Sequence, residues 1–367
     1  MKSRIVVLLI LCLTLYQISI SCINKQLISP ASGVLKSESL NIIPAPTNLS
    51  HLLFGILGSE KAWRHRKAYT ESWWRPGATR GALFLDKLPS EAWSPTLPPY
   101  RVSDDLRGLL INKHDLRASR MVHGILEVMR EFAAGDHQQV RWVVMGDDDT
   151  IFFVDNIVEV LARLDHTRYF YLGGQSEFLM SGYWFSFEEA FGGAGIIMSY
   201  PVAKALAEDM DGCLKRYAYL FSSDNTTKNC IADIGTNLSP QMGSHQIDLL
   251  GDISGFLSSH PLSPLLSLHH MDKVEPIFPS RDRFESTRHL MRAAAADQSR
   301  MLQQTICHHR QTNWTISIAW GYSAQIYETI FPRSHLQMPL ETFKPWSKRR
   351  DISLPFYKFN TRAPSIL

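Results

Sequence analysis

The chain has 367 residues, of which 45% are hydrophobic, and its formal net charge is +3. Such a chain can bury one large core or two ordinary ones, and its composition excludes a disordered or fibrous protein. The small net charge provides no basic surface of the kind that nucleic-acid-binding proteins carry, so we expect no nucleic-acid partner.

The N-terminus carries the pattern of a secretory signal. Residues 1–4 include Lys2 and Arg4, and an apolar run follows over residues 5–20. The run is short for a membrane span, which needs about 20 apolar residues. Two interpretations of residues 1–22 therefore stay open, a cleaved signal peptide and a signal-anchor. In both cases we expect the rest of the chain to be lumenal or extracellular.

The cysteines become informative in such a compartment, because oxidising conditions permit disulfide bonds. Cys213 and Cys230 are the preferred pair and would close a short loop, which leaves Cys307 free or paired elsewhere. Asn-x-Ser/Thr tripeptides predict glycosylation acceptors at Asn48, Asn225, Asn237 and Asn313.

The body of the chain begins after a linker. Residues 23–50 contain prolines and no sustained periodicity, so we predict a stem or linker there. Residues 51–58 are apolar and predict the first strand. The basic segment over residues 63–67 follows it and has two interpretations, a phosphate-binding segment and a solvated helix face.

Strands and helices then alternate along the sequence. Residues 81–86 predict a second strand that ends in Asp86, which we assign to the nucleotide-binding surface. Apolar residues recur at largely helical spacing over residues 106–132, which predicts a crossover helix. This alternation is typical of an α/β fold with a Rossmann-like, mostly parallel sheet and flanking helices.

An acidic triplet marks the end of the central strand. Residues 142–146 are apolar and close with glycine, and Asp147, Asp148 and Asp149 follow directly. Ligands gather at the carboxyl ends of strands in such sheets, and hard divalent cations prefer carboxylate and phosphate oxygens. The triplet therefore indicates a metal site that binds a diphosphate, or, alternatively, acids that cap the next helix.

A glycine-rich turn lies further along the chain. Residues 169–174 predict a short strand, and residues 191–195 contain Gly193 and Gly195. Glycines let the backbone approach a ligand closely or turn sharply, so we assign both to the binding site. Ser199 and Pro201 then open another helix.

A series of short motifs appears in a specific order. In chain order they are Phe54-Gly55-Ile56, Trp73-Trp74-Arg75-Pro76, Arg80-Gly81, Leu85-Asp86, Met145-Gly146-Asp147-Asp148-Asp149-Thr150, Phe191-Gly192-Gly193-Ala194-Gly195, Asp211-Gly212-Cys213, Arg216-Tyr217, His245-Gln246-Ile247-Asp248, His260-Pro261-Leu262-Ser263-Pro264-Leu265, Ser267-Leu268-His269-His270-Met271-Asp272, Gln304-Thr305-Ile306-Cys307 and Trp320-Gly321-Tyr322. This series resembles the Fringe-related glycosyltransferases, in particular their land-plant branch.

The resemblance implies a GT-A type domain over residues 51–345, with residues 346–367 as a C-terminal tail. It implies an inverting transfer of a hexose from a UDP-sugar to a glycan or glycoside acceptor, with a β-1,3 linkage expected. Mn²⁺, or Mg²⁺ in its place, would bridge the diphosphate and the triplet. The implied location is a type II Golgi membrane, with the N-terminal segment as the anchor, or outside the cell if the signal is cleaved.

The resemblance also assigns residues to roles. Asp149 would contact the metal directly, and Asp147 and Asp148 would hold metal-bound water or the ribose. His270 matches the metal-binding histidine of the family, and the adjacent His269 is the alternative. A neutral imidazole can bind Mn²⁺.

The catalytic base is where the chain departs from the family. The second of two consecutive acids is expected at the position of Asn225, and an amide accepts no proton at neutral pH. Three explanations compete: Asp224 is the base, the protein is an impaired transferase, or the alignment slips by one residue. A non-catalytic relative that binds nucleotide sugar or glycan is thus the alternative to a transferase. A glycoside hydrolase is a third hypothesis, but it needs two carboxylates that flank a bond.

Overall fold

The computed structural model describes residues 45–111, 113–131, 140–259, 261–347 and 355–364. Residues Pro46–Leu367 form one compact unit. The predicted signal over residues 1–22 and most of the predicted stem lie outside the described residues. Within the described part of the chain, no helix combines the length and the apolar character that crossing a membrane requires.

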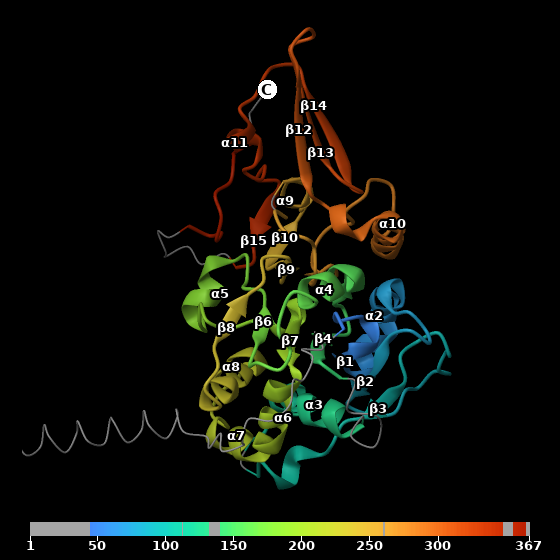
Figure 1. Ribbon diagram of the computed structural model, residues 1–367, viewed down its shortest axis with the longest axis vertical. Coiled ribbons are helices and arrows are strands. Elements are labelled where there is room, and N and C mark those ends of the chain that lie inside the picture. The colour runs from blue at the N-terminus through green and yellow to red at the C-terminus, as the bar shows by residue number, and fades with distance from the viewer. Residues whose placement is uncertain (1–44, 112, 132–139, 260, 348–354, 365–367) are drawn as a thin grey trace, which may run out of the picture. The chain divides into compact units, whose positions relative to one another are not determined.

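A seven-stranded sheet forms the centre of this unit, in the order β3-β2-β1-β4-β7-β6-β8 (Figure 1). All of its neighbouring strands pair in parallel except at β7, which runs antiparallel to β4 and β6. The strands span Leu52–Leu57 (β1), Arg80–Leu85 (β2), Tyr100–Val102 (β3), Trp142–Asp147 (β4), Tyr171–Gly173 (β6), Ile196–Ser199 (β7) and Leu238–Pro240 (β8). The carboxyl ends of every strand but β7 therefore lie at one edge.

Helices cover both faces of this sheet, because side chains of a strand alternate between its faces. Leu52, Phe54 and Ile56 of β1 pack in one buried cluster, whereas Leu53 and Leu57 pack in the other. The first cluster includes side chains of α2 (Glu60–Trp73), α4 (Val154–Leu161) and α10 (Arg283–Ala296). The second includes side chains of α3 (Arg117–Glu131), α6 (Tyr200–Glu208), α7 (Met210–Arg216) and α8 (Ser223–Asp233).

Smaller sheets complete the unit. One of them joins β5 (Ile151–Phe152), β11 (Ser267–Leu268) and β9 (Ser244–His245), and it brings the residues after β11 back to the turn that follows β4. Another pairs β10 (Leu249–Gly251) with β15 (Phe343–Pro345), and a third contains β12 (Gln304–His309), β13 (Trp314–Ala319) and β14 (Ser323–Tyr327). The remaining short helices are α5 (Leu179–Trp184), α9 (Ser254–Leu257) and α11 (Arg333–Leu336).

The predicted α/β class, with a mostly parallel sheet and flanking helices, is confirmed. The crossover helix is shorter than predicted: residues Leu106–Gly108 form a separate 3-10 turn, and α3 begins only at Arg117. The side chains of Asp105 and Asp115 explain the break, because each accepts a hydrogen bond from the backbone N–H two residues later.

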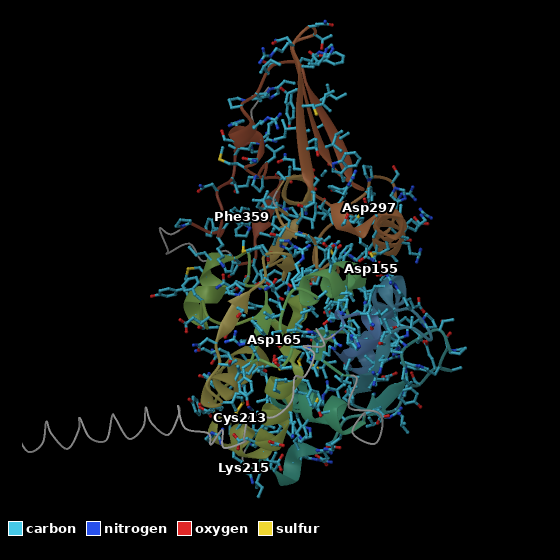
Figure 2. All side chains as sticks on the ribbon, in the orientation of Figure 1. Asp155, Asp165, Cys213, Lys215, Asp297 and Phe359 are labelled. Atoms are coloured by element: carbon cyan, nitrogen blue, oxygen red, sulfur yellow. A yellow bond between two sulfur atoms is a disulfide. The ribbon has the colours of Figure 1, made fainter. Side chains whose placement is uncertain are left out.

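The predicted disulfide bond is present. Cys213 of α7 (labelled in Figure 2) is bonded to Cys230 of α8, and Cys307 is exposed and free. The segment predicted as a tail also contacts the domain where it is described. Tyr357 pairs with Phe178, and Arg362 pairs with Leu340. The domain boundary at residue 345 stays a prediction.

Candidate functional site

A cavity of about 910 Å³ lies at the carboxyl edge of the central sheet. This volume is in the range of ligand-binding pockets, which is about 300–1,000 Å³. Its walls come from the ends of β1 and β4, from α2 and α3, and from the segments around residues 193, 224 and 269–272. The lining residues include Arg64, Arg66, Arg117, Arg120, Asp147, Asp148, Gly193, Asp224, His269, His270, Asp272 and Arg283.

The acidic triplet is held by a tight turn after β4. The hydroxyl of Thr150 accepts a hydrogen bond from the N–H of Asp147 at 2.8 Å and donates one to the carbonyl of Gly193, also at 2.8 Å. This hydroxyl therefore connects the triplet to the glycine-rich turn. The structure brings together two sequence motifs that are over forty residues apart.

The imidazole of His269 lies beside the acidic triplet. Its Nε2 lies 3.1 Å from Asp149 Oδ1 and 3.7 Å from Asp147 Oδ2. One ligand atom from each of these three residues lies within 4.8 Å of the others. Buried Oδ2 atoms of Asp148 and Asp149 have no hydrogen-bond partner among the described residues. Unpartnered carboxylate oxygens beside an imidazole fit a divalent cation such as Mn²⁺ or Mg²⁺.

His270 faces a different partner. It has a positive φ of 55°, its Nδ1 lies 3.1 Å from Asp248 Oδ1, and its ring stacks on Trp346. Both histidines line the cavity, but only His269 lies within contact distance of the triplet. The geometry thus favours His269 over His270 as the metal-binding histidine, contrary to the position implied by the family resemblance. The choice of His269 stays a prediction.

The carboxylates of the triplet have unusual acidities because they are crowded and buried. Burial raises the pKa of Asp147 to about 7 and that of Asp148 to about 6, and the neighbouring acids add to both shifts. Burial opposes ionisation of Asp149 as well, but His269 and Arg66 hold its pKa below the ordinary range. Burial lowers the pKa of His269, yet Asp149 and Asp147 raise it to about 9. The site therefore attracts positive charge.

Asp224 and Asn225 point in different directions from the first turn of α8. Asp224 lines the cavity, and its Oδ1 accepts a hydrogen bond from the N–H of Gly192 at 3.1 Å. Asn225 instead donates from Nδ2 to Oε2 of Glu189 at 3.0 Å. Burial raises the pKa of Asp224 to about 6 and that of Glu189, which is fully buried, to about 7.

The two glycines have separate roles. A Cβ atom on Gly193 would lie 2.1 Å from Cε1 of His269, so only glycine permits the imidazole to approach this turn. Gly195 has a φ of 93°, and a Cβ there would lie 2.7 Å from the ring of Phe152. Gly193 therefore belongs to the site, whereas Gly195 shapes the turn behind it.

Asp86 does not lie in the cavity wall. It is exposed, and its Oδ1 accepts a hydrogen bond from the N–H of Glu60 at 2.8 Å, at the start of α2. An acid at a helix N-terminus is a normal capping arrangement. In this structure Asp86 positions α2 and touches no residue of the triplet.

Several site residues were not identified from the sequence. Arg120, Asp248, Asp272, Glu189 and Arg283 belong to helices or loops whose patterns are ordinary. Asp248 and Asp272 lie within motifs that carry the family resemblance, and this is the sequence feature that connects them with the site. The basic segment after β1 was predicted to be phosphate-binding or solvated, and its Arg66 lines the cavity with a side chain that is 24% exposed.

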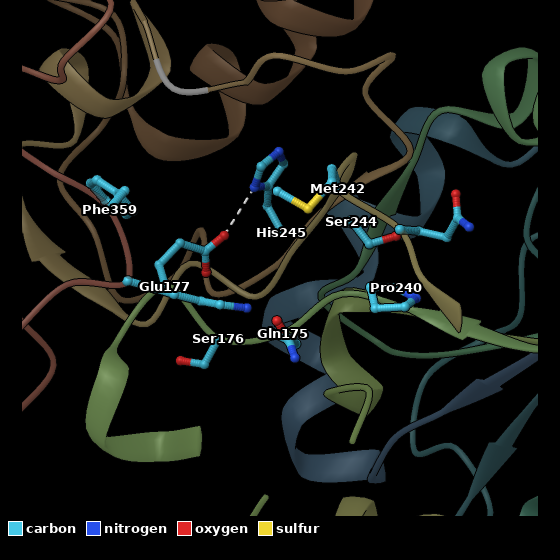
Figure 3. Close-up of a pocket in the computed structure, with 10 residues that line it drawn as sticks. Gln175, Ser176, Glu177, Pro240, Met242, Ser244, His245 and Phe359 are labelled. Carbon is cyan, nitrogen blue, oxygen red and sulfur yellow. Dashed lines mark hydrogen bonds and ion pairs between the residues drawn. The ribbon is translucent and has the colours of Figure 1, made fainter. Parts of the chain in front are cut away.

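A second, smaller cavity of about 100 Å³ lies beside the ends of β6 and β8 (Figure 3). Glu177 forms a buried pair there with Nδ1 of His245 at 2.9 Å, and its other oxygen accepts a hydrogen bond from the N–H of Ile247. Ser176, which also lines this cavity, donates to Oδ2 of Asp248. Asp248 thus connects this wall to His270 in the larger cavity.

Two family models and a set of solved structures are similar to this chain. A family model described as "Protein of unknown function, DUF604" matches residues 181–366, and a model described as "Fringe-like" matches residues 109–245. No curated protein matches the chain. Among solved structures, a glycosyltransferase involved in the glycosylation of the major capsid of PBCV-1 is similar, with 10% identity and a TM-score of 0.30 over 65% of this chain and 98% of that one.

Proposed function

The chain belongs to the Fringe-related glycosyltransferase family, and from that premise we propose that it transfers a hexose from a UDP-sugar to a hydroxyl group of a glycan or glycoside. The transfer would invert the anomeric centre and form a β-1,3 linkage. The observation that carries the proposal is the cluster of Asp147, Asp149 and His269 in a cavity of about 910 Å³. This cluster would hold Mn²⁺ or Mg²⁺, and the cation would neutralise charge on the departing diphosphate.

In the proposed reaction, Asp224 acts as the general base. The acceptor oxygen forms a bond to the anomeric carbon while the bond from that carbon to the phosphate oxygen breaks, and UDP leaves with the electron pair. The acceptor proton moves to the carboxylate of Asp224. A base works best when its pKa lies near the working pH, and the raised pKa of Asp224, about 6, meets that condition.

The position of Asn225 supports a transferase over an impaired relative. The amide contacts Glu189 rather than the cavity, so its presence removes no carboxylate from the wall where an acceptor would bind. Asp224, one residue earlier, supplies that carboxylate. The explanation in which Asp224 is the base therefore has direct geometric support.

We also propose a secretory location, as a type II Golgi membrane protein or a secreted one. The disulfide bond between Cys213 and Cys230 supports an oxidising compartment. The anchor itself would lie in residues 1–22, outside the described residues.

The test is UDP release by the purified lumenal body with UDP-galactose, UDP-N-acetylglucosamine and UDP-glucose, each with Mn²⁺ and with a chelator. We expect Mn²⁺-dependent release from one donor, and loss of it in Asp224→Asn. Glu208→Gln, a change at an exposed acid of α6, is the matched control and should leave release unchanged. Absence of release from every donor, with UDP binding retained, would favour the binding relative.

A further inference from the structure

Arg66 is the one residue of α2 whose side chain reaches three carboxylates among the described residues. Its Nη1 lies 3.0 Å from Asp148 Oδ1 and 3.2 Å from Asp149 Oδ1, and its Nη2 lies 2.6 Å from Asp272 Oδ2. Asp148 and Asp149 are almost fully buried. A buried carboxylate needs a compensating charge, and the guanidinium supplies it here.

One oxygen atom is shared between two partners. Asp149 Oδ1 contacts both Nη1 of Arg66 and Nε2 of His269. Because the cluster of Asp147, Asp149 and His269 is the proposed cation site, a divalent cation and the guanidinium need the same carboxylate. Two positive groups this close repel each other strongly where the effective dielectric constant is low.

We propose that Arg66 is a positioning residue that a divalent cation displaces from Asp149, after which its guanidinium binds the diphosphate of the donor. This inference rests on the proposed function. Arg66 lines the cavity and its side chain is 24% exposed, so its head can turn without disturbing the core. Guanidinium groups bind phosphate through two parallel hydrogen bonds, which makes an arginine suited to both partners.

In this arrangement Arg66 has effects of opposite sign on the binding of the cation and of the nucleotide. It weakens binding of the cation alone, because it competes for Asp149. It strengthens binding of the nucleotide once the cation is present, because it contributes a charged donor to the phosphates. A purely structural arginine would not produce this pair of effects.

The first measurement is Mn²⁺ binding by the full chain without nucleotide, followed by electron paramagnetic resonance. We expect Arg66→Gln to bind Mn²⁺ about tenfold more tightly than the native chain, a coupling typical of linked sites. Lys61→Gln is the control, because it removes one positive charge from an exposed position of the same helix, outside the cavity lining. Its Mn²⁺ affinity should change by about twofold or less.

The second measurement is UDP binding at saturating Mn²⁺ by calorimetry. We expect Arg66→Gln to lose about tenfold or more in UDP affinity, the effect of one hydrogen bond to a charged group. Arg66→Lys keeps the charge without the planar fork, so it should show intermediate affinities for both ligands. It also keeps the test decisive if Arg66→Gln fails to fold.

Melting temperatures with and without Mn²⁺ provide a third readout. Mn²⁺ should raise the melting temperature of Arg66→Gln more than that of the native chain, because the cation then replaces the missing positive charge. Equal Mn²⁺ affinities in the native chain, Arg66→Lys and Arg66→Gln would overturn the inference and leave the proposed function intact. Absence of Mn²⁺ binding in every variant would instead remove the proposed metal site, and this inference with it.

Discussion

Two walls of the large cavity compensate their buried acids in different ways. At the wall of the triplet, Asp148 and Asp149 are compensated by full charges from Arg66 and His269. At a second wall, around Asp224, this carboxylate accepts backbone and hydroxyl hydrogen bonds, and Glu189, which is outside the cavity lining, accepts a hydrogen bond from the neutral amide of Asn225. The first wall is suited to exchanging one cation for another, and the second to taking up a proton.

Asn225 occupies a position from which a side chain contacts Glu189 and does not line the cavity. Consecutive residues of a helix point about 100° apart, and here Asp224 lines the cavity while Asn225 contacts Glu189. An acid at residue 225 would face Glu189 instead of an acceptor. The amide keeps that contact attractive, and it adds no further carboxylate beside Asp224.

The largest expected effect is at the wall of the triplet. We expect Asp149→Asn to reduce Mn²⁺-dependent UDP release by about a thousandfold, since metal stabilisation of a leaving group contributes several kcal/mol. Mn²⁺ affinity should fall in parallel, and binding is measured directly by electron paramagnetic resonance. Asp86→Asn is the matched control, because Asp86 is exposed and lies outside the cavity wall. A native Mn²⁺ affinity in Asp149→Asn would remove the metal assignment.

The next largest effect is expected at the second wall, at Asp224. Asp224→Asn should lower kcat by about a hundredfold, the usual contribution of a general base, while the affinities for Mn²⁺ and UDP stay native. The native enzyme should lose kcat/KM as pH falls through about 6, because Asp224 then becomes protonated. This acidic limb should be shallower in the residual activity of Asp224→Asn, measured at saturating Mn²⁺, because only the titration of Asp147 and Asp148 then remains. An unchanged limb in the variant would assign the base elsewhere.

A smaller effect is expected at the contact between Asn225 and Glu189. Asn225→Asp would place a second carboxylate against Oε2 of Glu189, which now lies 3.0 Å from the amide. We expect the free energy of unfolding at pH 8 to fall by about 2 kcal/mol, measured by urea denaturation, with no gain in activity. Asn225→Ala removes the amide without adding charge and separates the two causes. Higher activity in Asn225→Asp than in the native chain would contradict the role given to Asp224.

The sequence predicted the first wall better than the second for a physical reason. An acidic triplet at the end of an apolar strand has few structural alternatives, and a parallel sheet brings it to the ligand edge. Sequence order could not decide between His269 and His270, because nothing in the sequence indicates the positive φ of His270 or the separate partners of the two rings. Glu189 was not found because nothing in its local sequence shows that it meets Asn225, which lies 36 residues away. Arg66 was suggested only by general basicity.

An effect on stability alone, of similar size to that of Asn225→Asp, concerns Glu189. Burial raises the pKa of Glu189 to about 7, above its ordinary value of 4.5, so the folded state holds this proton more tightly than the unfolded state. The stability that follows is fully present below about pH 4.5 and is lost as pH rises through about 7. We expect Glu189→Gln to reduce the decline of unfolding free energy between pH 5 and pH 8 by about 1–3 kcal/mol. Asp147, Asp148 and Asp224 have raised pKa values as well, so part of the decline should remain in the variant.

Urea denaturation at four pH values measures the change of unfolding free energy with pH, and Glu208→Gln is the control for loss of an exposed carboxylate. Equal slopes in the native chain and Glu189→Gln would mean that Glu189 is ionised in the fold. The amide of Asn225 would then be compensating a full negative charge, and the second wall would resemble the first more closely than its contacts indicate.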